Sequence, residues 1–413
     1  MSIVFPEVIP VADLRAAVSA DYRPKEIQRR NWLYDSEAFK RHKQEFLIKR
    51  QIEMHGFNRE YQERLKRTPY VNVYAPIIAW WGNAVIQDPP HVEGGLSYLN
   101  DELPLVVRSL VNDCLLHQRS WLHLRMINDE PHFDVVDALA VDDWCDDYLR
   151  TSSSKTVRLS PFNGKTTQID YWDYFTPDVH VRYEYDHARQ QNQQNPVALR
   201  SLEEPIDFVP FWEFTVPVGL HLGAQLEDLA VSAFNLQSAL IWLQSKQAYS
   251  IFVIKTQQQL DKVILSESSA LKLSPDDDAQ YVTPGNAPGD QLADTIDRTI
   301  ADMYRIAHES ALLAVGQNAN ESGLSKRLDY TSLAVSLRFI REGVKAVLND
   351  ALIDAAKILK ISPPTLQGLE EMEPTEPTEE QDDGTGQQPT DTAAATPADA
   401  TGDALTGPGS VTT

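Results

Sequence analysis

The sequence predicts an α+β fold that is mainly α, and three observations support this prediction. Over 219–246, 287–307 and 333–352, apolar residues recur every three or four positions, which is typical of amphipathic helices. Between 134 and 185, short apolar runs alternate with turn residues, which is typical of strands. The chain of 413 residues is 42% hydrophobic and 23% charged, an ordinary globular composition with room for two or three domains.

The first 70 residues carry dense charge, and apolar residues such as Phe39, Phe46, Ile52 and Met54 are thinly spaced among it. This pattern predicts solvent-facing helices, with a break at 22–24. The basic runs could contact nucleic acid or a partner, but the interpretation we prefer is a solvated helix face.

The middle of the chain opens with an apolar segment, 70–81, that predicts a core element. Helical spacing from Leu103 to Cys114 predicts a helix over 103–117, and the alternation over 121–126 predicts a strand. Further strands are expected at 135–136, 157–159, 169–175, 179–185 and 206–214. Turns at 163–164 and 176–177 and a polar loop at 189–195 separate them.

Three long helices are expected in the second half of the chain. A short β-like section separates the first two, with runs at 249–255, 263–265 and 271–273. A small polar link, 316–323, separates the second helix from the third. Gly343 lies inside the third helix, where glycine costs about 1 kcal/mol relative to alanine.

Charge is distributed unevenly along the chain, whose formal net charge is −23 and whose pI is near 4.8. From Glu370 to Thr413 there are 11 acidic residues and no Lys or Arg, which leaves −12 on residues 1–369. This tail almost lacks large apolar residues, so we expect it to be disordered. The acidic balance disfavours a broad DNA-neutralising protein and a polybasic membrane-surface protein.

Cys114 and Cys145 lack the spacing of a disulfide framework or a metal site. We expect two buried or half-buried thiols in a reducing compartment. The apolar N-terminus is short and is interrupted by Pro6 and Pro10, so we do not expect a signal peptide. The apolar runs are far shorter than the roughly 20 residues of a membrane span, and we expect a soluble protein made inside the cell.

Active-site motifs are missing from the sequence, which has no Walker A loop, GxGxxG, HExxH or GxSxG pattern. His117 and His123 are the nearest pair among scattered histidines, but they fall on an expected helix and the following strand and predict no metal site. The acidic run 276–278 lacks the spacing of a calcium loop and is expected to be a solvated turn.

One acidic set keeps an enzymatic alternative open, and its members are Asp142, Asp143, Asp146 and Asp147. Clustered carboxylates could hold two Mg²⁺ ions in a metal-dependent nuclease or hydrolase. A solvated acidic loop or helix start is the interpretation we prefer, because no Lys or His accompanies them. The sequence therefore indicates a protein that is not an enzyme and that has neither a metal nor another cofactor.

Five segments from Tyr70 onward stand out by their order and spacing: 70–78, 209–214, 226–238, 280–284 and 320–327. In this order they resemble bacteriophage portal proteins, the rings at one capsid vertex through which DNA enters and leaves. The first two are similar to the family's early core helix and its proline-containing strand. The next two resemble the first stem helix and the return into the second. The last, Asn320-Glu-Ser-Gly-Leu-Ser-Lys-Arg327, is similar to the tunnel loop and tunnel helix.

The resemblance implies a portal-like subunit with a wing, long stem helices, a small clip and a short helical C-terminal region. The expected parts are a wing region over 1–218, a first stem helix over 219–248, a clip-like segment over 249–286, a second stem helix over 287–314, a tunnel loop over 315–325, a tunnel helix with a C-terminal wing or crown helix over 326–362, and a disordered acidic tail over 363–413.

The resemblance also implies the function, a passive dodecameric channel for DNA packaging and ejection in the virion, assembled in the host cytoplasm. The implied partners are other copies of the chain, the terminase large subunit, head–tail adaptor and tail proteins, the major capsid protein, and double-stranded DNA that passes without sequence preference, with no membrane involved. An acidic wall suits this role, because each phosphate contact would add affinity and drag. Another neck or coat protein remains a further possibility.

The residues expected to line the narrowest part of the channel are Gln317, Asn318, Asn320, Glu321, Ser322, Lys326 and Arg327. Gln317, Asn318 and Asn320 would offer neutral contacts to the DNA. Lys326 and Arg327 would either contact phosphates weakly or form ion pairs between subunits.

Overall fold

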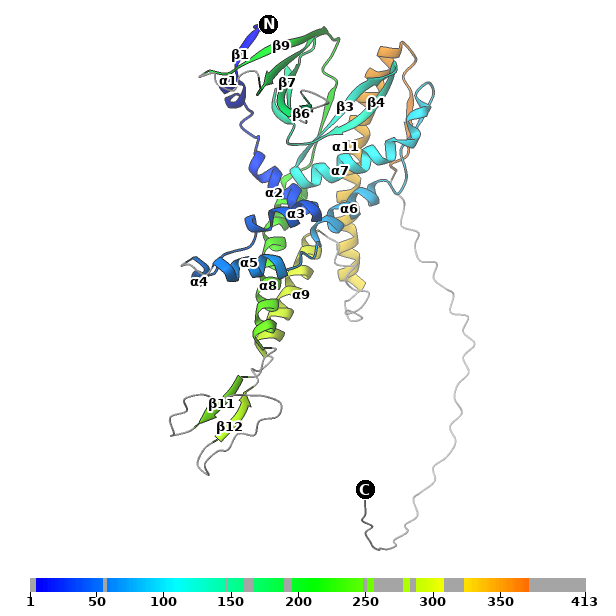
Figure 1. Ribbon diagram of the computed structural model, residues 1–413. Helices are drawn as coiled ribbons and strands as arrows, with labels where there is room; N and C mark the ends of the chain where they lie inside the picture. Colours follow the sequence, from blue (N-terminus) through cyan, green and yellow to red (C-terminus); the bar gives the residue numbers. More distant parts are fainter. Residues whose placement is uncertain are drawn as a thin grey trace, which may run out of the picture. The chain divides into compact units, whose positions relative to one another are not determined.

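The computed structural model of the protein describes residues 5–54, 58–145, 147–158, 166–188, 195–247, 251–255, 278–282, 287–307 and 323–370 (Figure 1). Every structural statement that follows concerns these residues. They belong to one compact unit that spans 1–371. Helices and strands are mixed in it, which confirms the α+β class.

The larger sheet is antiparallel and six-stranded, in the order β1-β9-β8-β7-β6-β5. Its strands are β1 (Val8–Pro10), β5 (Val141–Cys145), β6 (Tyr148–Arg158), β7 (Thr166–Phe175), β8 (Val179–Asp186) and β9 (Val197–Pro205). In β8 every second side chain, Val181, Tyr183 and Tyr185, is buried, as a sheet covered on one face requires. The cover is α1 (Val11–Ala16), which packs Val11 and Leu14 against these residues.

Three smaller sheets complete the strands of the described residues. One has the order β10-β3-β4, with β10 (Phe211–Thr215), β3 (Arg119–Ile127) and β4 (Glu130–Val136). The others are the pairs β2 (His91–Glu93) with β13 (Thr365–Gln367), and β11 (Ile251–Lys255) with β12 (Asp278–Val282). Gln118, with a left-handed φ of 72°, lies between α7 (Leu103–His117) and β3 and turns the chain from helix into strand.

The remaining helices are α2 (Pro24–Tyr34), α3 (Ser36–His42), α4 (Gln51–Met54), α5 (Asn58–Arg67), α6 (Tyr74–Val85), α8 (Leu222–Gln247), α9 (Ala287–Ile306) and α11 (Gly323–Leu359), with 3₁₀ turns at Lys43–Glu45, Ser97–Asp101 and Val218–Leu220. Most of them share one apolar core, in which Ile77, Trp81, Leu110, Leu226 and Val344 are buried. This core joins the N-terminal helices, the three-stranded sheet and the long helices of the second half.

Several predicted elements are confirmed. The helix over 103–117 has the predicted bounds, and its apolar positions are buried. The apolar segment 70–81 enters the core as α6 and the residues before it. The expected strands at 121–126, 135–136, 169–175 and 179–185 lie within β3, β4, β7 and β8, and residues 251–255 form β11. The expected runs at 263–265 and 271–273, the turn at 163–164 and most of the loop at 189–195 lie outside the described residues.

The first 70 residues are helical as predicted, and the charged side of these helices faces solvent, but their other side is buried, which the prediction missed. Leu33, Phe39, Phe46 and Tyr61 are buried in the main core. The Phe39 ring stacks on Tyr70 with 3.7 Å between ring centroids. A few aromatic side chains bury enough area to hold charged helices against a core, although their spacing gives a weak helical signal.

Two strand expectations also need correction. The strand expected over 206–214 begins only at Phe211, because Pro210 has no N–H to donate to a ladder. Strand β9 was not predicted, because charged residues such as Glu203 hide its alternation. Its place between β8 and β1 gives it hydrogen-bonding partners on both sides.

Three expected boundaries shift. The α-helix expected from 219 begins at Leu222, after a 3₁₀ turn over Val218–Leu220. Residues 323–325 belong to α11 and not to a loop, since Leu324 and Leu328 extend the apolar spacing of that helix by one turn. The tail expected to be disordered from 363 includes β13, and Leu369 is buried with its N–H bonded to the Asp88 carbonyl at 3.1 Å.

Gly223, in the first turn of α8, lies against the C-terminal end of α7. A Cβ atom there would be 2.0 Å from the Leu116 carbonyl oxygen and 2.7 Å from its carbon, both backbone atoms. We expect Gly223→Ala to destabilise the protein by about 2 kcal/mol or more in denaturant unfolding, because the helices must separate.

Gly219 is the matched control, because a Cβ there would meet nothing within 4 Å. Gly219→Ala should change the free energy of unfolding by less than about 0.5 kcal/mol. Equal effects of the two substitutions would contradict the close approach of α7 and α8.

Candidate functional site

The predicted channel residues fall at the junction between α9 and α11. Gln317, Asn318, Asn320, Glu321 and Ser322 lie outside the described residues. Lys326 and Arg327 lie in the first two turns of α11. The structure therefore describes the helices on either side of this junction.

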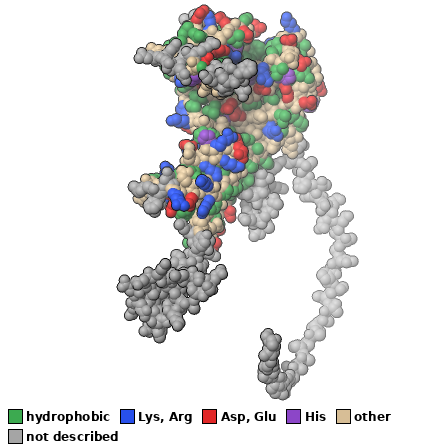
Figure 2. Space-filling view, in the orientation of Figure 1, with side chains coloured by type: hydrophobic (Ala, Val, Ile, Leu, Met, Phe, Trp, Pro, Cys, Tyr) green, Lys and Arg blue, Asp and Glu red, His purple; other side chains and the backbone are tan. Residues whose placement is uncertain are grey.

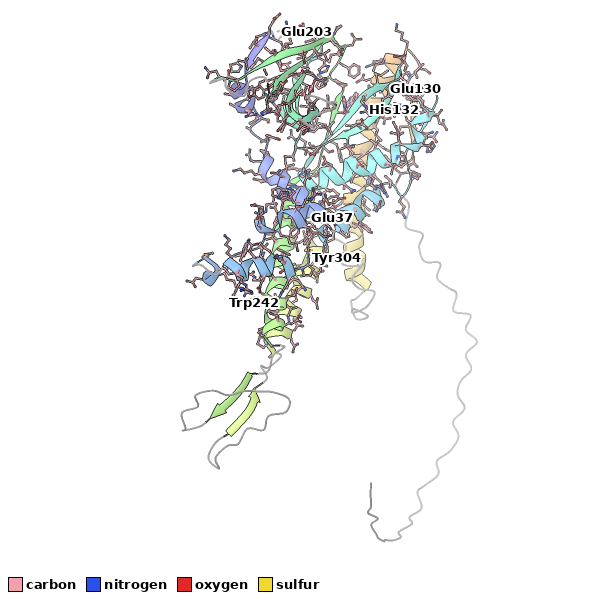
Figure 3. All side chains as sticks on the ribbon, in the orientation of Figure 1. Glu37, Glu130, His132, Glu203, Trp242 and Tyr304 are labelled. Atoms are coloured by element: carbon pink, nitrogen blue, oxygen red, sulfur yellow. The ribbon has the colours of Figure 1, made fainter. Side chains whose placement is uncertain are left out.

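Helices α8 and α9 run alongside one another in opposite directions (Figure 1). No charged residue occurs over 229–245, so α8 is uncharged on every side for most of its length. Helix α9 differs, because it buries Ile296 and Met303 and exposes Asp290, Asp294 and Asp297. Figure 3 shows Trp242 on α8 and Tyr304 on α9.

A buried ion pair fixes α5 against α8. The Arg64 Nη1 donates to both carboxylate oxygens of Glu53, at 2.6 and 2.8 Å, and its Nε donates to Ser238 Oγ of α8 at 3.2 Å. Burial by itself would raise the pKa of Glu53, but hydrogen bonds from the Arg64 side chain and the Arg50 backbone hold it below its usual value. The carboxylate is therefore ionised and paired in the core.

Further polar contacts bind the N-terminal helices to α8. Glu227 accepts from Arg30 Nε at 3.1 Å and lies 2.7 Å from Arg29 Nε. Asn235 receives a hydrogen bond from the Ile48 N–H and donates to the Phe46 carbonyl, each at 2.9 Å. These contacts and the Arg64 pair were missed by the sequence analysis, because partners far apart in the chain leave no local pattern.

Helix α11 is fixed by one cation and one glycine. The buried Arg341 guanidinium donates from Nη2 to the Ala84 carbonyl at 2.8 Å, at the C-terminal end of α6, where backbone carbonyls favour a positive charge. Gly343 lies against β10, since a Cβ there would be 2.8 Å from the Phe214 ring. This close approach explains a glycine inside a long helix.

A second buried polar group lies where α7 ends. His117 Nε2 is 2.8 Å from Asn31 Oδ1, and burial lowers the pKa of His117 to about 3. Burial likewise lowers the pKa of His221 to about 4 and raises that of Asp113 to about 7. At neutral pH both histidines are uncharged, and they pack as polar core residues.

Asp142 and Asp143, two members of the acidic set, have separate partners. Asp142 is buried and accepts from Arg150 Nε at 2.6 Å, while Asp143 accepts from the Tyr148 hydroxyl at 2.7 Å. Both lie in β5, which has an irregular register against β6 between Val141 and Asp143, so the expectation of a loop or helix start is wrong for them. Asp147 is exposed in the turn after β5, and Asp146 lies outside the described residues.

Other candidate ligands are also separated. His123 stacks on Phe211 in the three-stranded sheet, with 4.3 Å between ring centroids. Cys114 is buried as expected, whereas Cys145 is exposed at the end of β5. Over the described ranges, no three His, Cys, Asp or Glu side chains lie close enough to share a metal ion. In the same ranges, no helix combines the length and apolarity that crossing a membrane requires.

The surface charge is locally basic although the chain is acidic. Figure 2 shows Lys and Arg side chains gathered over α4 and α5. Exposed members of this patch include Lys49, Arg59, Lys66 and Arg67. The basic runs of the sequence thus form a solvated helix face on the outside of a buried aromatic cluster.

Comparison with solved structures gives matches to two necks of GTA particles and to one phage portal protein, all with TM-scores below 0.5. No family model and no curated protein matches the chain. The neck of an empty GTA particle with C6 symmetry is 11% identical, with 71% of this chain and 79% of that chain covered and a TM-score of 0.34. The neck of a native GTA particle with C12 symmetry is 11% identical, with coverage of 74% and 82% and a TM-score of 0.32.

An HK97-family phage portal protein from Corynebacterium diphtheriae is also similar. It is 11% identical to this chain, with coverage of 72% and 91% and a TM-score of 0.31.

Removing Arg64 should destabilise the fold strongly. In Arg64→Met the Glu53 carboxylate would stay buried without its partner, so we expect a loss of about 3–5 kcal/mol in denaturant unfolding. Arg59→Met is the control, because Arg59 pairs with Glu63 at 3.4 Å but is almost fully exposed. The free energy of unfolding of Arg59→Met should fall by less than about 1 kcal/mol. A similar fall in Arg64→Met and Arg59→Met would show that burial of the Arg64–Glu53 pair is unimportant.

The buried His117 should make stability sensitive to acid. The folded protein keeps it neutral down to a pKa of about 3, whereas the unfolded chain binds a proton at the ordinary pKa of 6.5. The contribution of His117 to stability is thus lost as pH falls from 6.5 toward 3, by about 2 kcal/mol between pH 7 and pH 5. Urea unfolding of His117→Gln should show a drop in the free energy of unfolding between pH 7 and pH 5 that is about 2 kcal/mol smaller than the drop in the parent.

Asp113 provides the opposite control. Its raised pKa means that the folded protein binds the extra proton below about pH 7, which stabilises it as pH falls. Asp113→Asn should therefore lose more stability than the parent between pH 7 and pH 5. A pH dependence unchanged in both variants would rule out these two groups as its source.

Proposed function

We propose that this chain is the subunit of a ring-shaped portal at one capsid vertex of a virion, through which double-stranded DNA is packaged and ejected. The observation that carries the proposal is the order of the long helices: α8 and α9 lie side by side, and the short 308–322 segment joins α9 to the 37-residue α11. This order agrees with the stem, tunnel-loop and tunnel-helix order that the sequence resemblance implies.

In this proposal α8 and α9 are the stem helices, residues 249–286 the clip, and α11 the tunnel helix followed by the C-terminal wing or crown. Gln317, Asn318, Asn320, Glu321 and Ser322 line the narrowest part of the channel, with Lys326 and Arg327 at the start of α11. Exposed carboxylates on α9 support a wall that repels the duplex, because a basic wall would bind phosphates and slow their passage.

The channel would act without catalysis. A separate terminase would dock on the clip and supply the energy for packaging, and a head–tail adaptor would take its place afterwards. The major capsid protein would surround the ring, which would be dodecameric and assembled in the host cytoplasm. Asp142 and Asp143 each pair with a different side chain of β6, and no three candidate ligands gather among the described residues, which supports this choice over a metal-dependent nuclease.

Electron microscopy of the purified full chain tests the proposal. We expect closed rings with a central hole at least as wide as the roughly 20 Å of a B-DNA duplex. A monomer that cleaves DNA with a divalent cation would contradict it. Asp143→Ala with Asp147→Ala should leave the rings and packaging intact, whereas a nuclease would lose its activity in this double variant.

A further inference from the structure

Residues 361–370, which follow α11, return to the segment 88–93 that follows α6. We call residues 361–370 the strap. Its strand β13 pairs with β2, and each of these strands has three residues. A pair of strands this short is only marginally stable by itself. The closed position of the strap therefore depends on its other contacts with the body.

The contacts that close the strap lie mostly at its C-terminal end. The Leu369 N–H donates to the Asp88 carbonyl at 3.1 Å, and the Glu370 N–H donates to the Asp88 carboxylate at 3.0 Å. The Leu369 side chain is 2% exposed and belongs to the main core. Ile361 and Leu366 are partly buried against that core. Leu369 is therefore the main apolar anchor of the strap.

Backbone strain opposes this anchor. Leu369 has a φ of 57°, in the left-handed region that bulky residues rarely adopt. Gly368 has a φ of 84°, and a Cβ atom there would be 2.3 Å from the Pro89 carbonyl oxygen. Burial of the Leu369 side chain has to offset the strain of its own backbone, so the closed strap gains less free energy than its burial alone would give.

The other end of the strap is built to bend without disturbing α11. Lys360 has a φ of 54° and ends the helix, and the Ile361 N–H donates to the Ala356 carbonyl at 3.0 Å. Pro363 and Pro364 follow, and neither has an N–H that could continue a helix or a ladder. The end of α11 is therefore closed by its own hydrogen bonds, and these do not involve β13.

We propose that the strap opens as a unit, turning about residues 360–364, while the rest of the body stays folded. Opening breaks the short ladder to β2, the two bonds to Asp88 and the burial of Leu369, and it relieves the left-handed strain. Openings that break so few contacts need much less free energy than global unfolding. The open strap leaves backbone groups of β2 unpaired, and an unpaired strand edge is a template for another strand. The inference does not depend on the proposed portal.

Thiol labelling with N-ethylmaleimide measures the opening in the full chain. The background is Cys145→Ser, because Cys145 is exposed, while buried Cys114 of α7 stays as the reference for unfolding of the body. In Leu369→Cys, the introduced thiol should be labelled at least about a hundredfold faster than Cys114. Its rate should hardly change with urea below the unfolding transition, because local opening exposes little surface. The Cys114 rate should rise steeply with urea.

Leu348→Cys in the same background is the matched control. Leu348 is fully buried in α11, so this variant loses the same side-chain atoms from the same core. Its introduced thiol should be labelled no faster than Cys114. Equal labelling at positions 369 and 348, whether fast or slow, would overturn the proposal.

Two further substitutions separate opening of the strap from unfolding of the body. Gly368→Ala should raise the labelling rate at position 369 by at least about tenfold, because the added Cβ destabilises only the closed strap. Arg64→Met breaks contacts with Glu53 and Ser238 and none with the strap. It should raise the Cys114 rate and leave the rate at position 369 unchanged. An equal rise at both positions in Arg64→Met, or no rise at 369 in Gly368→Ala, would overturn the proposal.

Discussion

The crossing of α7 and α8 is the constraint on which the rest of the structure depends. At Gly223 the two helices approach so closely that the Leu116 carbonyl occupies the place of a Cβ atom. The Tyr74 hydroxyl donates to the Gly223 carbonyl at 2.8 Å, so α6 meets the same point. The direction of α8 is set there, and α9, which packs along α8, follows it.

Polar side chains along α8 then hold this helix in the direction that the crossing sets. Glu227, Asn235 and Ser238 lie along α8 and each contacts an N-terminal segment. Because the partners are buried or half-buried, each contact has only a few geometries that satisfy its hydrogen bonds. The charged N-terminal helices therefore serve as a brace for α8, while their basic outer face stays in solvent.

Elements could be predicted from the sequence where their own apolar residues mark which side of the helix or strand is buried. The bounds of α7 and the strands β7 and β8 could be predicted because their apolar residues repeat with the period of the element. The burial of Phe39 and the Arg64–Glu53 pair could not, because these depend on partners such as Tyr70 and Ser238 that other segments bring. At the junction between α9 and α11, the sequence predicted a long helix on each side but placed the start of the second helix too late, since Gly323 already belongs to α11.

A half-covered uncharged helix such as α8 forgoes part of the free energy that burial of its apolar side chains could contribute to folding, because apolar area exposed to water contributes nothing. Residues 229–245 carry no charge, yet α9 and α5 cover only part of this helix, and Leu236 and Ile241 stay partly accessible. The exposed carboxylates of α9 and the uncharged surface of α8 therefore place two different chemistries on neighbouring helices.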